Sequence, residues 1–124
     1  MIDPRRAFGN SGEDLAAAHL ERNGMTVLER NVSTFAGEAD IVAEERGEIV
    51  FVEVKTRQVD DFGWPEESIT PSKFRRMQLT AEAILSERGW EKRFWRLDVI
   101  AIRIVDGTDP EIVHLKAVDK PYGG

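Results

Sequence analysis

The chain has 124 residues, of which 41% are hydrophobic and 32% are charged, and its formal net charge is −6. This size predicts one globular domain over residues 1–124, with flexible ends at 1–8 and 119–124. With no cysteine and only two histidines, the chain has no disulfide framework, no thiol nucleophile and no zinc cluster.

The sequence carries no secretory signal and no apolar run long enough to cross a bilayer. We therefore expect a cytoplasmic protein that does not enter membranes. The negative net charge argues against general coating of nucleic acid, so phosphate binding would need a local cluster of basic side chains.

The N-terminal half predicts one helix and three strands. Ser11 and Asp14 have the spacing of a capping box, and Gly24 is a stop signal, which predicts a helix over residues 12–23. Strands are expected over 25–32, 38–44 and 48–57. The last two flank Arg46-Gly47, which indicates a hairpin closed by a tight turn or by a bulge at the glycine.

The C-terminal half predicts a second helix and two more strands. After an expected loop over 58–69, Thr70 as N-cap and Pro71 at the first helical position begin a helix that Gly89 ends. Strands over 94–105 and 111–118 follow. The order αβββαββ predicts an α/β fold in which helices flank a mixed sheet. The core stripe of the second helix is expected to be Phe74, Met77, Ala81, Ile84 and Leu85.

The hairpin places acidic side chains opposite one another. If the turn closes symmetrically, Asp40 faces Glu53 and Glu38 faces Lys55 on one face of the hairpin. Two carboxylates about 5 Å apart repel by roughly 3 kcal/mol at an effective dielectric near 20. A cation is therefore expected to offset this repulsion. The other face is apolar and should join the core through Ile41, Ala43, Val50, Val52 and Val54.

A third carboxylate, Glu13, shares a helical stripe with Ala16, Ala17 and Leu20 and should point toward the sheet. If the helix crosses the hairpin, the carboxylates of Glu13, Asp40 and Glu53 lie near the single positive charge of Lys55. A divalent cation would balance the two remaining negative charges. Oxygen ligands without Cys or His select Mg²⁺ or Mn²⁺.

Two features of this acidic group stay open at this stage. An acid and a lysine two residues apart also occur as an ordinary ion pair in a strand, which is the competing interpretation of Glu53 and Lys55. Glu38 is either a ligand or a partner of Lys55 at the rim. Asp98 is expected to lie at a strand end and to form a local bond.

Basic side chains near the second helix are candidates for DNA contacts. Lys73, Arg75 and Arg76 begin the helix, and Arg57 ends the strand that carries Glu53. A solvated helix face is the alternative. Gln78 lies on the inward stripe and either reaches the acidic site or bonds to the backbone. Loop aromatics Phe62 and Trp64 either stack on bases or pack on their own domain.

Several segments together resemble a known family: Gly12-Glu13, Gly37-Glu38-Ala39-Asp40-Ile41, Phe51-Val52-Glu53-Val54-Lys55-Thr56-Arg57, Lys73 and Arg96-Leu97-Asp98. They are similar to the YraN family of small bacterial proteins, which belongs to the PD-(D/E)XK endonuclease superfamily and is related to archaeal Holliday junction resolvases. The resemblance runs from about residue 9 to 105. Ala39 stands where the proline of the superfamily motif would be.

The resemblance implies a restriction-endonuclease-like sandwich. It also implies Asp40 and Glu53 as metal ligands assisted by the Val54 carbonyl, Glu13 as a further acidic site residue, and Lys55 as the catalytic lysine. Related resolvases act as symmetric dimers, although no residue here fixes an oligomeric state. We expect an Mg²⁺- or Mn²⁺-dependent nuclease acting on branched or structured DNA. The alternative is a non-catalytic module that binds nucleic acid or protein.

Overall fold

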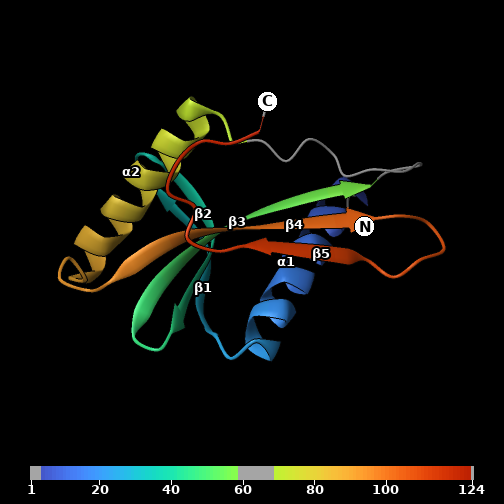
Figure 1. The fold of residues 1–124 in the computed structure, drawn as a ribbon, viewed down its shortest axis with the longest axis horizontal. Helices are drawn as coiled ribbons and strands as arrows, with labels where there is room; N and C mark the ends of the chain where they lie inside the picture. Colours follow the sequence, from blue (N-terminus) through green and yellow to red (C-terminus); the bar gives the residue numbers. More distant parts are fainter. Residues whose placement is uncertain (1–3, 59–68, 124) are drawn as a thin grey trace.

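The computed structural model describes residues 4–58 and 69–123, with side chains from residue 12 onward (Figure 1). The predicted order αβββαββ is confirmed. The expected loop with Phe62 and Trp64 lies almost entirely outside the described residues, as do 1–3 and 124 of the expected flexible ends. The elements are α1 (Pro4–Arg22), β1 (Thr26–Thr34), β2 (Gly37–Glu45), β3 (Glu48–Gln58), α2 (Pro71–Arg88), β4 (Trp95–Ile104) and β5 (Glu111–Leu115).

The five strands form one mixed sheet in the order β1-β2-β3-β4-β5. Neighbouring strands are antiparallel except for β3 and β4, which are parallel and are connected through α2. The two helices lie on opposite faces of the sheet (Figure 1). Strand β3 is central, and its first half is almost fully buried from Ile49 to Val52.

Each face of the sheet has its own core. On the α1 face, Ala16, Ala17 and Leu20 pack against the apolar side of the hairpin, as predicted. On the α2 face, the complete predicted stripe of the helix is buried with Val42 and Phe51. No described helix is long and apolar enough to cross a bilayer.

Helix α2 has the predicted ends. Thr70 Oγ1 accepts a hydrogen bond from the Lys73 N–H at 3.1 Å, which caps the first turn. Gly89 ends the helix in the left-handed conformation, with φ of 71°. Helix α1 differs from the prediction because it begins at Pro4, so Ser11 lies inside the helix and does not cap it. Proline suits a first helical turn, and this start signal competes with the later one.

The hairpin register is confirmed near the turn. Arg46 and Gly47 have φ of 51° and 84°, the paired left-handed conformations of a two-residue type I′ turn. Pairing then runs without a bulge from Glu45↔Glu48 to Ile41↔Val52. Pairing stops at Ile41↔Val52. The predicted pairs Asp40–Glu53 and Glu38–Lys55 are therefore not formed in the strand register. Strands β2 and β3 separate at this point.

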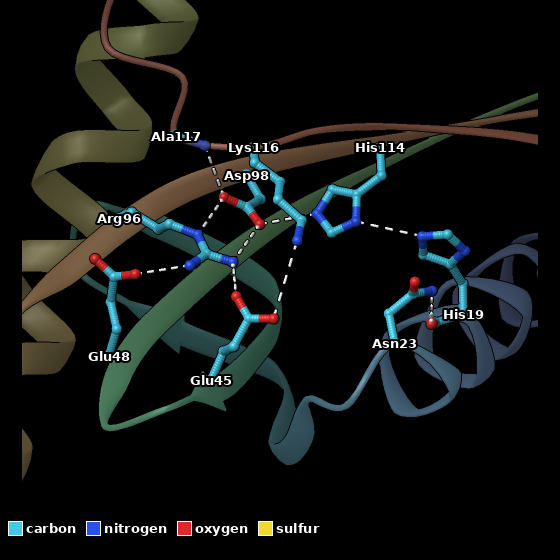
Figure 2. A network of polar contacts seen from close by, with 9 residues as sticks. All are labelled: His19, Asn23, Glu45, Glu48, Arg96, Asp98, His114, Lys116 and Ala117. Atoms are coloured by element: carbon cyan, nitrogen blue, oxygen red, sulfur yellow. Dashed lines mark hydrogen bonds and ion pairs between the residues drawn. The ribbon is translucent and has the colours of Figure 1, made fainter.

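Asp98 is a buried hub inside β4, so the prediction of a strand-end residue is wrong (Figure 2). It accepts hydrogen bonds from Arg96 Nε at 3.0 Å and from the Ala117 N–H at 3.0 Å, and its Oδ2 lies 2.8 Å from His114 Nε2. Burial alone would raise the pKa of Asp98, but these hydrogen bonds hold that pKa below its usual value. Strand β5 ends at Leu115, before the predicted boundary, and the chain then turns through Ala117, which has φ of 54°.

The same hub connects distant elements. Arg96 also binds Glu48 at 2.6 Å and Glu45 at 2.9 Å, both beside the β2–β3 turn. On the other side, His114 Nδ1 lies 3.3 Å from His19 Nε2 on α1 (Figure 2). The cluster therefore ties the hairpin, β4, β5 and α1 together.

Replacing Asp98 with Asn should destabilise the fold by about 3 kcal/mol, because Arg96 would lose the fully buried one of its three carboxylate partners. Urea unfolding at pH 7 measures this change. Glu91→Gln, at an exposed acid, serves as the control and should change stability by less than about 0.5 kcal/mol. Equal stability of the two variants would show that the cluster contributes little.

Candidate functional site

Asp40 lies at the point where β2 and β3 separate. Its Oδ2 accepts a hydrogen bond from the Val54 N–H at 2.8 Å. Because the strand pairing has ended at Val52, this side chain supplies the acceptor that a neighbouring strand would otherwise provide. The carboxylate is therefore held between the two strands by the backbone of the central one.

The surroundings of Asp40 favour its neutral form. Burial is the largest cause, followed by the negative charge of Glu53, with smaller contributions from Glu13 and Glu38. The hydrogen bond from Val54 opposes them, and the net effect raises the pKa of Asp40 to about 7. This carboxyl group therefore changes charge near neutral pH.

Glu53 faces α2 and forms an ion pair with Lys73. The Lys73 Nζ lies 2.8 Å from Glu53 Oε1, and only 15% of the Glu53 side chain is exposed. We expected Lys55 to be the balancing cation. Lys55 is half-buried and, two residues after Glu53 on β3, lies on the same face of the strand.

Glu13 approaches the site from the α1 face, opposite to Glu53. With its amide nitrogen turned toward the acids, Asn31 Nδ2 lies 2.9 Å from Glu13 Oε1 and 3.3 Å from Glu38 Oε1. Burial raises the pKa of Glu13, although the charge of Arg30 opposes the shift. Sequence reasoning missed Asn31. The signal was an Asn inside a predicted strand, since Asn adopts the left-handed conformation seen here (φ 54°) more readily than most residues.

Gly12 determines how closely α1 approaches β3. A Cβ atom at this position would lie 2.1 Å from Thr56 Oγ1 and 3.0 Å from Thr56 Cβ, so no rotation of the threonine would make room for it. Glycine therefore lets the helix contact the strand that carries Glu53. This contact places the next residue, Glu13, beside the acidic group.

A small hollow lies between α2 and the β2–β3 hairpin. Its polar lining consists of Glu38, Glu53 and Thr80. The remaining lining is apolar: Ala39, Phe51, Val52, Met77, Ala81 and Leu97. Glu53 therefore borders a hollow with a largely apolar lining.

The predicted basic residues divide into two groups. Arg57, Arg75 and Arg76 are exposed and form no ion pair with any described residue. Lys73 is engaged by Glu53. The structure does not bring Gln78 to the acids, because it lines a separate groove with Phe74, Trp95 and Arg96.

The acidic group thus consists of the Asp40 and Glu53 carboxylates, with Glu13 and Glu38 nearby, and it is not a compact cluster. In the ranges 12–58 and 69–123, no three Asp, Glu or His side chains are arranged to hold a metal ion. Asp40 and Glu53 are close enough for the charge of one to shift the pKa of the other. Two carboxylates with water as the remaining ligand form a donor set that Mg²⁺ commonly accepts.

Comparison with known proteins gives one consistent family. The model of the uncharacterised protein family UPF0102 matches residues 12–102. A UPF0102 protein of Mycobacterium sp. strain KMS is 47% identical over 116 residues, covering 92% of this chain and 86% of the relative. One from Desulfitobacterium hafniense strain Y51 is 41% identical over 123 residues, covering 95% of this chain and all of the relative. The chain therefore belongs to family UPF0102, the YraN family that its sequence resembles.

Proposed function

We propose that this protein is a metal-dependent nuclease that hydrolyses phosphodiester bonds in branched or otherwise structured DNA. One observation carries the proposal: the Asp40 carboxylate is fixed by the Val54 N–H beside Glu53, and its pKa is raised to about 7. A strongly perturbed acid next to a second acid is typical of a functional site.

Asp40 and Glu53 would hold Mg²⁺ or Mn²⁺. The Val54 carbonyl is a third donor, because the N–H and C=O of one strand residue point to the same side, and the Val54 N–H points toward Asp40. All these donors are oxygens, which suits hard divalent ions. Such an ion, when bound, lowers the pKa of a coordinated water and polarises a phosphate group.

Lys55 and Glu13 have supporting roles in this proposal. Lys55 lies on the Glu53 face of β3, where its ammonium group would orient a scissile phosphate and stabilise charge on the phosphoryl oxygens. Glu13, whose pKa is raised, would hold or accept a proton at the α1 side of the site.

The unpaired arginines support DNA as the partner. Arg57, Arg75 and Arg76 are exposed cations without ion pairs to described residues, so no described carboxylate competes with a phosphate for them. The net charge of −6 confines phosphate binding to this local surface. A homodimer would present the surface twice and so strengthen the grip on a branched substrate.

The ion pair between Lys73 and Glu53 favours a second candidate, a non-catalytic module that binds nucleic acid or protein. In that case the lysine permanently neutralises the carboxylate. Cleavage assays on linear, flapped and four-way DNA with Mg²⁺ or Mn²⁺, comparing wild type with Glu53→Gln, separate the candidates. If the wild-type protein binds DNA but does not cleave it, the second candidate, a binding module, is supported.

Lys55→Ala should reduce cleavage by about 100-fold or more while changing DNA affinity by less than about twofold, because the lysine acts on charge that develops during the reaction. Single-turnover cleavage and fluorescence anisotropy provide the two measurements. Lys92→Ala, at an exposed lysine, is the control. Cleavage at the wild-type rate would remove Lys55 from the mechanism.

Asp40→Asn should change how stability depends on pH. A folded-state pKa of about 7, raised from 3.8, means that the folded protein binds this proton more tightly than the unfolded chain. Wild-type stability from this group is therefore lost as pH rises from about 4 through about 7. Asn keeps the acceptor for Val54 without the charge, so the variant should gain roughly 2 kcal/mol over wild type between pH 5 and pH 8.

Urea unfolding at both pH values tests this, and adding Mn²⁺ at pH 8 extends the test. Mn²⁺ should stabilise the wild-type protein and leave Asp40→Asn nearly unchanged. A constant difference between the two proteins over this pH range would show that Asp40 titrates normally. Equal stabilisation of both by Mn²⁺ would place the ion elsewhere.

Lys73→Met should bind Mn²⁺ about fivefold more tightly than wild type, because the partly exposed ion pair that competes for Glu53 contributes up to about 1 kcal/mol. Calorimetric titration at pH 8 measures the affinity, with Lys73→Arg as a variant that retains the competing charge. Unchanged affinity in Lys73→Met would mean that an ion does not use Glu53.

A further inference from the structure

We propose that Phe35 stacks on an unpaired nucleobase and so selects DNA with unpaired nucleotides near the cleavage site, an inference that rests on the proposed nuclease function. Phe35 lies in the two-residue turn between β1 and β2 and is 93% exposed. Its ring contributes almost nothing to the core. A fully exposed ring in a tight turn, where polar residues are usual, is available to a ligand.

The turn that carries Phe35 is held in one conformation by Thr34. The Thr34 Oγ1 accepts hydrogen bonds from the N–H groups of Ala36 at 3.1 Å and Gly37 at 3.2 Å, and it donates to the Gly37 carbonyl at 2.9 Å. The hydroxyl thus uses its donor and both acceptor positions. The backbone that carries Phe35 is therefore held in one conformation before any ligand binds. This order lowers the entropy cost of binding.

The turn is also fixed against α2. Gly37 has φ of 152°, and a Cβ atom there would lie 2.9 Å from Thr80 Oγ1 and 3.2 Å from Arg76 Cγ. Only glycine permits this approach. The contact places the Phe35 turn beside Arg76, an exposed cation with no ion pair to any described residue.

The exposed Phe35 ring and Arg76, whose side chain borders Gly37 at the end of the same turn, match the two parts of a nucleotide. The ring offers a stacking surface for a base, and Arg76 offers a charge for the adjoining phosphate. A protein partner of apolar character would require a contiguous apolar patch, whereas the residues at this turn include Arg76, which borders Gly37, and the exposed acid Glu38. The exposed Arg76 guanidinium therefore favours a partner that carries phosphate over an apolar protein surface.

The position relative to Asp40 limits where the unpaired base would lie. Phe35 precedes Asp40 by five residues, which span at most about 17 Å at roughly 3.4 Å per residue. That length corresponds to no more than about five nucleotides at the spacing of a stacked strand. The substrate class is thus DNA with an unpaired base within a few nucleotides of the scissile bond, as in a flap or a branch.

The test uses the intact protein in EDTA with flapped DNA that carries 2-aminopurine at the first unpaired positions. Wild type should change the 2-aminopurine fluorescence, and Phe35→Ala should lose this change and bind the flapped DNA about tenfold more weakly. Phe35→Trp retains a stacking ring and should restore both. Blunt duplex of the same length should bind wild type and Phe35→Ala equally.

Phe94→Ala is the matched control. Phe94 is also highly exposed, at 84%, but its carbonyl accepts a hydrogen bond from the Ile49 N–H near the first residue of β3, before the strand reaches Glu53. Its removal should leave affinity and fluorescence within about twofold of wild type. Equal losses in Phe35→Ala and Phe94→Ala, or no loss in Phe35→Ala, would overturn the proposal.

The outcomes separate this proposal from the proposed nuclease function. If wild type cuts DNA but Phe35→Ala binds and cuts every substrate as wild type does, the stacking role fails and the nuclease function stands. If wild type cuts nothing but the fluorescence change depends on Phe35, the stacking role stands and the protein is a binding module.

Discussion

The candidate site depends on one hydrogen bond, from the Val54 N–H to the Asp40 carboxylate, at the point where two strands part. A central strand cannot leave its N–H groups unpaired in a protein interior without a large cost in free energy. Asp40 satisfies one of them with a side chain, and this allows β2 and β3 to separate. The same bond holds a carboxyl group beside Glu53, where like charge and burial raise its pKa. The bond that lets the strands separate is therefore also the bond that holds the carboxyl group whose pKa is raised.

Asp40 and Asp98 show how surroundings separate a reactive acid from a structural one. Asp98 is fully buried and Asp40 is partly buried, and burial favours the neutral form of each carboxyl group. Around Asp98, however, Arg96, His114 and a backbone N–H supply donors, so its pKa falls and it acts as a fixed anion that connects several elements. Around Asp40 the neighbours are mainly other acids. A group of neighbouring acids favours binding of a cation, whereas an acid paired with its donors stabilises the fold.

Local rules predicted those parts of the fold that local interactions form. The type I′ turn at Arg46-Gly47 follows from the residues themselves, and it fixed the register of the hairpin as far as Ile41↔Val52. Thr70, Pro71 and Gly89 likewise predicted both ends of α2. Where two start signals competed, as in α1, the prediction failed. It failed again at Asp98, because a buried acid inside an apolar strand is stable only with partners from other elements.

The sequence alone determined which side chains are available for the proposed chemistry: oxygen donors without cysteine, and a lysine two residues after an acid. The tertiary structure decided their partners. It paired Glu53 with Lys73, joined Glu13 and Glu38 through Asn31, and turned Gln78 into another groove. These contacts depend on how α1 and α2 lie on opposite faces of the sheet and on where β2 leaves β3. Such relations join residues far apart in the chain, and no turn or helix period encodes them.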